Sequence, residues 1–127
     1  MLVDHRVDVD VPQLVVANVR EAMATVSATY FGHPAEDLLV VGVTGTNGKT
    51  TTTWMLRNIF TAARRKSEVI GTLSGARTTP ESPDLQRRLA EWRDDGVEIV
   101  AMEVSSHAID QRRVDAMKFR VACRSPR

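Results

Sequence analysis

The chain has 127 residues, which is enough for one small domain and too few for several. Its 43% apolar and 26% charged residues are typical of a globular protein, and its net charge of +1 gives no electrostatic reason to expect nucleic acid or a membrane surface as a partner. The single cysteine, Cys123, excludes an internal disulfide. No apolar run approaches the roughly 20 residues of a membrane span, and no apolar signal core follows Met1. These features predict a cytoplasmic protein.

The N-terminal part of the chain has the pattern of a strand followed by a helix. Valines alternate with aspartates over residues 7–11, which is the spacing of a β-strand. Pro12 suits the start of a helix, and apolar residues at helical spacing continue from Val15 to Tyr30. A Gly-His-Pro sequence at 32–34 then ends the pattern. We therefore expect one strand and one long helix before residue 32.

The middle of the chain predicts strand, helix and strand. Residues 38–43 are apolar without alternation, as in a parallel strand buried on both faces. Residues 50–65 have helical spacing, and the basic residues 64–66 stand where cations suit a helix C-terminus. Residues 68–73 are typical of a second strand.

The last part continues the alternation. A loop over residues 74–82 leads to Ser82 and Pro83, a capping residue and a first helical residue for a helix that ends at Gly96. We expect a third strand at 97–103, a short helical stretch to about 113, and a fourth strand at 119–123. Because strands and helices alternate, the predicted class is α/β, with a mainly parallel sheet flanked by helices.

The stretch 42–51, Gly-Val-Thr-Gly-Thr-Asn-Gly-Lys-Thr-Thr, has the layout of a phosphate-binding loop between a strand and a helix. Glycines let backbone N–H groups approach an anion closely, and the start of a helix favours negative charge. We expect Lys49 to reach the outer phosphates and the Thr50 hydroxyl to bind Mg²⁺. The usual formula has glycine at the position of Val43, so the loop is a variant. The alternative is a glycine-rich turn with a solvated lysine.

Glu103 ends the predicted third strand and is a second candidate magnesium residue. Right-handed crossovers would bring it to the same edge of the sheet as the phosphate-binding loop, where ligands bind in such folds. The alternative is a carboxylate at the end of a strand, in solvent.

Polar residues follow Glu103. Ser105 and His107 are close in sequence, but no orienting acid is evident, so polar ligand contacts are favoured over a hydrolytic triad. Gln111 and Arg113 lie further along the same polar stretch. The guanidinium of Arg113 suits a carboxylate or phosphate of a substrate, although spacing alone would equally fit a solvated helix face.

Taken together, these residues resemble the Mur ligases. The similarity rests on the loop at 42–53, on Thr-Thr-Pro at 78–80, on Met-Glu-Val-Ser-Ser-His-Ala at 102–108, and on Gln111 with Arg-Val-Asp at 113–115. The loop alone is shared with folylpolyglutamate synthase and cyanophycin synthetase. The segment after Glu103 points to the branch of Mur ligases that adds the third residue of the peptidoglycan stem peptide.

The resemblance implies an activity and a site. ATP would phosphorylate the D-glutamate side chain of UDP-N-acetylmuramoyl-L-alanyl-D-glutamate, and the amine of a diamino acid, meso-diaminopimelate or L-lysine, would attack the acyl phosphate. Lys49 and Glu103 would be catalytic, and Thr50 and Glu103 would bind Mg²⁺. The residues implied for the ATP phosphates are Gly45, Thr46, Asn47, Gly48, Lys49, Thr50 and Thr51, and those implied for the UDP-linked dipeptide are Thr78, Thr79, Ser105, Gln111 and Arg113.

The family has three domains, so the resemblance also implies a division of this chain. Residues 1–11 are expected to be a remnant of an N-terminal UDP-binding domain, residues 12–123 an incomplete ATP-binding central domain, and residues 124–127 an aberrant or truncated tail. The family continues after the fourth strand with Asn-Leu-Ser-Arg-Asp-His-Leu-Asp, where this chain has Arg-Ser-Pro-Arg. A reading-frame shift or a truncated gene model is the expected cause, and these residues alone are expected to be inactive as a ligase.

Three other classes stay open on the sequence. The chain could be the ATP-binding part of a folylpolyglutamate-type or cyanophycin-type ligase, a phosphate-loop kinase or nucleotidase, or a non-catalytic nucleotide-binding module. The segment at 102–113 favours the Mur ligase interpretation over the first of these. Stimulation of ATP turnover by a UDP-muramoyl dipeptide, and not by a phosphoryl acceptor, would separate it from the second.

Overall fold

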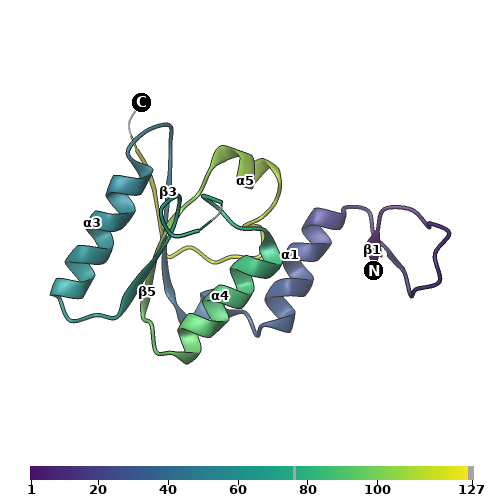
Figure 1. Ribbon diagram of the computed structural model, residues 1–127, viewed down its shortest axis with the longest axis horizontal. Coiled ribbons are helices and arrows are strands. Elements are labelled where there is room, and N and C mark those ends of the chain that lie inside the picture. The colour runs from purple at the N-terminus through teal and green to yellow at the C-terminus, as the bar shows by residue number, and fades with distance from the viewer. Residues whose placement is uncertain (76, 126–127) are drawn as a thin grey trace.

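The computed structural model describes residues 1–75 and 77–125, and most of them form one α/β unit (Figure 1). Its sheet has four parallel strands in the order β4-β5-β3-β6. The strands are β3 (Leu39–Thr44), β4 (Ser67–Ile70), β5 (Ile99–Glu103) and β6 (Val121–Arg124). The predicted fold class is therefore confirmed. Of the tail expected at 124–127, residues 126 and 127 lie outside the described residues.

Helices cover both faces of this sheet (Figure 1). One face carries α3 (Lys49–Ala62), and the other carries α4 (Ser82–Asp94), with α1 (Val19–Tyr30) and α2 (Pro34–Asp37) packed against α4. The short α5 (Ser106–Asp110) follows β5. None of the described helices is long and apolar enough to cross a bilayer.

The core explains why apolar and polar residues do not alternate along β3. Val40 and Val43 on β3 are fully buried, and Val41 between them is only 6% exposed, because helices cover both sides of the strand. On the α4 side, Leu85 and Leu89 pack into the cluster that contains Val40. Burial of a leucine side chain contributes about 1.5–3 kcal/mol, so α4 is a main stabilising element of the sheet.

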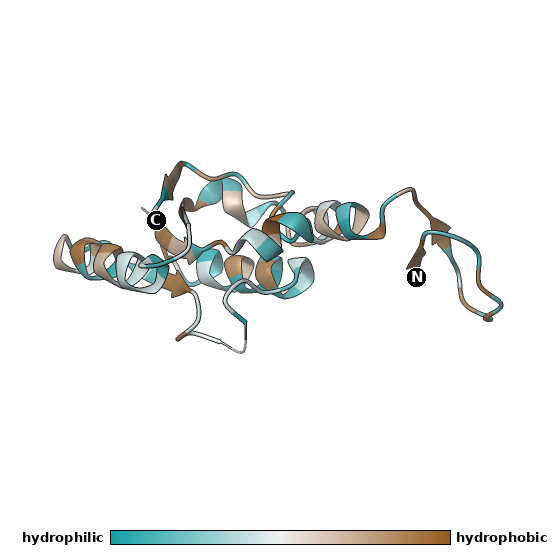
Figure 2. Cartoon of the chain, turned by 90° about the horizontal axis from the view of Figure 1, so that it is seen from above, coloured by the Kyte–Doolittle hydropathy of each residue, from teal (hydrophilic) through white to brown (hydrophobic). Residues whose placement is uncertain are grey.

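The N-terminal segment differs from the prediction. No strand forms over residues 7–11; instead β1 (Leu2–Val3) pairs in parallel with β2 (Leu14–Val15), and residues 4–13 form the loop between them. The side chain of Gln13 holds that loop through hydrogen bonds with the backbone N–H and carbonyl of Val7, at 3.0 and 2.8 Å. The alternating valines remain exposed because no neighbouring strand covers them. This small sheet projects from the start of α1, away from the main body (Figure 2).

The first helix begins at Val19 and not at Pro12. Asn18 caps it, since its side-chain oxygen accepts hydrogen bonds from the N–H groups of Arg20 and Glu21, both at 3.1 Å. Residues 12–18, which we expected to be helical, instead contribute β2 and the turn that leads to this cap.

Substitution of Asn18 by alanine is expected to lower the free energy of unfolding by about 1 kcal/mol, because two N–H groups at the start of α1 lose their acceptor. Urea unfolding followed by circular dichroism measures the change. Asn18→Asp retains a side-chain acceptor and is expected to unfold like the wild-type chain. An equal loss in both variants would contradict the capping role.

Other boundaries shift for local reasons. The helix predicted to reach Arg65 ends at Ala62, and Arg64 has a φ of 59°, which is outside the helical region. Arg65 instead pairs with Glu98 at 2.7 Å. The strand predicted to reach residue 73 ends at Ile70, because residues 71–74 form a turn in which the Ser74 hydroxyl and N–H both bond the backbone of Gly71. The cap of α4 is Glu81, one residue earlier than expected, and α2 was not predicted.

Candidate nucleotide and substrate site

The predicted phosphate-binding loop connects β3 to α3 at the C-terminal edge of the sheet. Gly45 and Gly48 have φ values of 126° and 78°, which side-chain-bearing residues rarely adopt. α3 begins at Lys49 without a side-chain cap, so N–H groups of its first turn have no partner within the helix. Such a helix start attracts anions, and the loop therefore has the backbone geometry that a phosphate needs.

Lys49 curls back over this loop. Its ammonium donates to the carbonyl of Gly45 at 2.8 Å and to that of Thr46 at 3.3 Å. The same side chain lines a cavity of about 540 Å³ beside the loop. The lysine is thus positioned at the cavity, where a phosphate group would compete with the two carbonyls for its charge.

Glu103 lies opposite the start of α3. Register pairs its Cα with that of Val43, so the carboxylate and the loop share one edge of the sheet, as the crossover argument predicted. The side chain is 1% exposed, and its Oε2 accepts a hydrogen bond from the Thr50 hydroxyl at 3.0 Å. A solvent-exposed carboxylate, the alternative considered for this position, is wrong.

The sequence did not single out the residues that make room for Glu103 and hold it. Thr72 donates to Glu103 from its N–H, at 3.1 Å to Oε1, and from its hydroxyl, at 3.3 Å to Oε2. Gly71 allows the close approach, since a Cβ there would fall 2.0 Å from Oε1. Both residues follow β4 directly. Because ligands bind at the carboxyl ends of parallel strands, this position was the signal by which the sequence could have indicated them as site residues.

The donor set at this point fits magnesium. Thr50 and Glu103 present a hydroxyl and a carboxylate oxygen 3.0 Å apart, both hard oxygen ligands. Residues 1–75 and 77–125 contain no group of three or more His, Cys, Asp or Glu side chains that could hold a metal ion. One carboxylate with few other protein ligands is the arrangement by which Mg²⁺ is held together with substrate phosphates.

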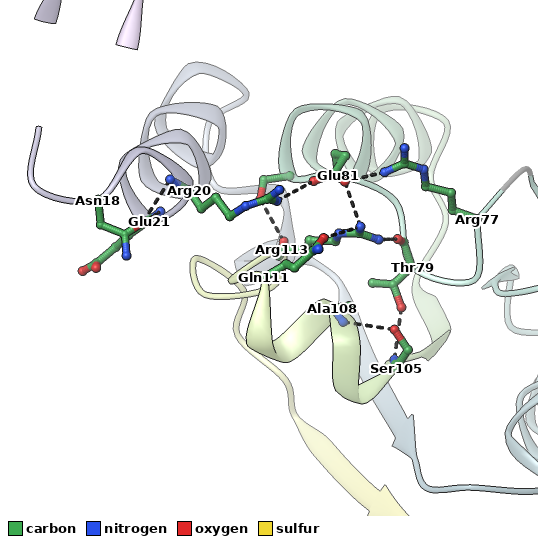
Figure 3. A network of polar contacts seen from close by, with 11 residues as sticks. Asn18, Arg20, Glu21, Arg77, Thr79, Glu81, Ser105, Ala108, Gln111 and Arg113 are labelled. Carbon is green, nitrogen blue, oxygen red and sulfur yellow. Dashed lines mark hydrogen bonds and ion pairs between the residues drawn. The ribbon is translucent and has the colours of Figure 1, made fainter. Parts of the chain in front are cut away.

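Thr79 connects the end of β5 to Ser105, which follows that strand (Figure 3). Its hydroxyl donates to the carbonyl of Glu103 at 2.9 Å and accepts from the N–H of Ser105 at 3.2 Å. The residue is 1% exposed, and these two hydrogen bonds stabilise the end of β5. The neighbouring Thr78 hydroxyl lies 3.0 Å from that of Thr72 and is therefore close to the Glu103 group.

Arg113 is the centre of a second polar group. One of its terminal nitrogens donates to the carbonyl of Thr79 at 2.9 Å, and the other contacts Gln111 Oε1 at 2.5 Å and Glu81 Oε1 at 2.9 Å. Within the described part of the chain its buried Nε has no hydrogen-bond partner. The solvated helix face, the alternative considered for Arg113, is wrong, because the residue is only 9% exposed.

Glu81 was not predicted from the sequence, yet it gathers three guanidinium groups (Figure 3). Besides Arg113 it pairs with Arg77 and, at 3.5 Å, with Arg20 of α1. One carboxylate against three cations leaves positive charge at this corner of the site. Hydrogen bonds link Glu103 to the Arg113 group through Thr72, Thr78, Thr79 and Ser105. Ser105 also lines the cavity beside the phosphate-binding loop.

A parallel sheet, a glycine-rich loop leading into a helix, and a buried acid beside that loop are the features of the phosphate-loop class of α/β domains. The model of the Mur ligase middle domain matches residues 43–124. The chain belongs to the Mur ligase family.

Curated relatives agree with this assignment. The chain is 43% identical to the UDP-N-acetylmuramoyl-L-alanyl-D-glutamate–2,6-diaminopimelate ligase of Geobacillus kaustophilus, over 96% of this chain and 27% of that protein. It is 45% identical to the ligase of the same name from Streptomyces coelicolor, over 87% of this chain and 24% of that protein. The chain thus spans about a quarter of the length of these relatives.

Solved structures show the same fold. A structure titled as a UDP-N-acetylmuramoyl-L-alanyl-D-glutamate–2,6-diaminopimelate ligase superposes with a TM-score of 0.82 at 24% identity, covering 98% of this chain and 27% of that one. MurF from Acinetobacter baumannii superposes with a TM-score of 0.63 at 26% identity, covering 97% of this chain and 26% of that one.

Proposed function

We propose that these residues are the ATP-binding part of an ATP-dependent amide ligase of peptidoglycan precursor synthesis. The supporting observation is the hydrogen bond from Thr50, at the start of the loop helix, to the buried carboxylate of Glu103. The ligase would join a diamino acid to the D-glutamate of UDP-N-acetylmuramoyl-L-alanyl-D-glutamate. The names of the relatives favour 2,6-diaminopimelate over L-lysine as that amino acid.

On the nucleotide side, residues 45–51 would hold the ATP phosphates. The N–H groups at the start of α3 face the anion, and Lys49 exchanges its carbonyl partners for the outer phosphates. Thr50 and Glu103 would hold Mg²⁺. When bound there, the ion supplies neutralisation of negative charge on the transferring phosphoryl group.

On the substrate side, Thr78, Thr79, Ser105, Gln111 and Arg113 would position the UDP-linked dipeptide. Arg113 and the positive charge around Glu81 suit the acidic groups of that substrate. Since the hydroxyl of Thr79 already makes two bonds within the protein, its contribution would be to fix Ser105.

The two sides would meet at the edge of the sheet. The side-chain carboxylate of D-glutamate attacks the terminal phosphorus of ATP, and ADP leaves. The amine of the diamino acid then attacks the acyl carbon, and phosphate leaves as the amide forms. The protein contributes positioning and charge neutralisation, which is what phosphoryl transfer requires.

The remaining parts of the chain fit this proposal as follows. Residues 1–11 would belong to a UDP-binding domain, residues 12–123 to the ATP-binding domain, and residues 124–127 to a tail that departs from the family pattern. The proposed location is the cytoplasm. Because the matched relatives are about four times longer, amide formation by residues 1–127 alone is not expected.

Replacement of Gln111 by alanine is expected to weaken binding of UDP-N-acetylmuramoyl-L-alanyl-D-glutamate about tenfold, since Arg113 loses the side chain that orients it. Calorimetric titration in the presence of a non-hydrolysable Mg·ATP analogue measures the affinity. Asn58→Ala, an exposed amide in the second half of α3, is the matched control and should leave the affinity unchanged. If the wild-type chain binds Mg·ATP but not this dipeptide, the proposed substrate side of the site is contradicted for residues 1–127.

A further inference from the structure

Arg124 reaches the phosphate-binding loop from a different strand. It is the last residue of β6, and in the parallel pairing of β3 with β6 its Cα stands opposite Thr44. Thr44 is the residue directly before Gly45 of the loop. The side chain therefore starts at the edge of the sheet where Lys49 and Glu103 are found.

The residue after it fixes this placement. The N–H of Ser125 donates to the carbonyl of Thr44 at 2.8 Å, and its hydroxyl donates to the carbonyl of Asn47 within the loop. A Cβ on Gly45 would fall 2.1 Å from the Ser125 hydroxyl oxygen. The end of β6 is thus packed directly on the loop, and the backbone of Arg124 is held beside it.

The charge around Arg124 points to an anion. Arg124 lines the same cavity as Lys49, and none of the other lining residues is acidic; they are Thr44, Gly45, Thr46, Ser105 and Ser106. Arg124 is exposed, and its guanidinium forms no hydrogen bond or ion pair within residues 1–75 and 77–125. Lys49, by contrast, already donates to two carbonyls. Arg124 thus adds a positive charge that no described side chain offsets.

We infer that Arg124 is a second phosphate-binding cation of this site and contacts the phosphates of the bound nucleotide alongside Lys49. This inference rests on the proposed nucleotide-binding function. A guanidinium suits the task because it can donate two parallel hydrogen bonds to phosphate oxygens. A residue of the segment that sequence analysis regarded only as an aberrant tail would then belong to the site.

Arg124→Gln tests the inference in calorimetric titrations with Mg·ATP and, separately, with magnesium tripolyphosphate, which lacks the nucleoside. We expect about tenfold weaker binding of both, because a charge-assisted contact is lost. Arg124→Lys keeps the charge but not the two parallel hydrogen bonds, and it should lose less affinity than Arg124→Gln. Arg120→Gln removes the same charge at the opposite end of β6 and should leave both affinities unchanged. Unaltered melting temperatures are expected, since the described contacts of the fold do not involve the Arg124 side chain.

Four results would overturn the inference. They are wild-type affinity in Arg124→Gln, an equal loss in Arg120→Gln, an equal loss in Arg124→Lys, and weaker binding of ATP without weaker binding of tripolyphosphate. In each case wild-type binding of Mg·ATP leaves the proposed nucleotide site standing. Failure of the wild-type chain to bind either ligand would instead contradict a working phosphate site within residues 1–127, and the inference with it.

Discussion

Replacement of Lys49 by alanine is expected to weaken Mg·ATP binding at least about 100-fold without unfolding the protein. The ammonium is the one group of the loop that carries a full positive charge, and each charge-assisted hydrogen bond to phosphate contributes about 1.5–3 kcal/mol. Two such bonds lost correspond to a factor of 100 or more. The fold should persist, because the ammonium bonds only to carbonyls of the loop that carries it.

Calorimetric titration of both proteins with Mg·ATP measures this difference, and urea unfolding checks the fold. Lys118→Ala is the matched control, since it removes an exposed lysine before β6 and should bind like the wild-type chain. Equal affinity of the Lys49→Ala and wild-type chains would show that the phosphates do not bind at this loop. Absence of binding by both would mean that residues 1–127 do not form a working site alone.

The positions in the fold that were predicted correctly rest on local patterns. The loop at 42–51 could be located because strand, glycines, lysine and helix follow one another within one short stretch. Glu103 could be placed next to it because parallel strands with right-handed crossovers end at one edge, and the register of Val43 with Glu103 confirms this. For such residues, chain order and periodicity determine position.

The parts that were missed depend on contacts between distant segments. Glu81 is central only because Arg20 of α1 and Arg113 after α5 fold against it, and neither contact is visible in the spacing of the chain. The valines at 7–11 alternate correctly for a strand, but no other strand is available to pair with them. Periodicity predicts which face a strand would bury, and only the tertiary structure decides whether a partner covers it.

Gly71 provides the second large effect. A Cβ at this position would lie 2.0 Å from Oε1 and 2.7 Å from Cδ of Glu103, so in Gly71→Ala the carboxylate must move. It would then lose hydrogen bonds from Thr50 and Thr72 while remaining buried. Overpacking costs about 1–3 kcal/mol, and an unsatisfied buried polar group a similar amount. We expect the free energy of unfolding to fall by about 3 kcal/mol.

Urea unfolding measures the loss, and Gly75→Ala in the same loop is the matched control. A Cβ at Gly75 would approach Arg88 no closer than 3.6 Å, an ordinary contact, so this variant should stay within about 0.5 kcal/mol of wild type. The cause can be isolated by repeating Gly71→Ala in a Glu103→Ala background. Because the clash is with the far end of the Glu103 side chain, the glycine substitution should cost much less there. An undiminished cost in that background would show that Gly71 serves the turn at 71–74 and not the approach of the carboxylate.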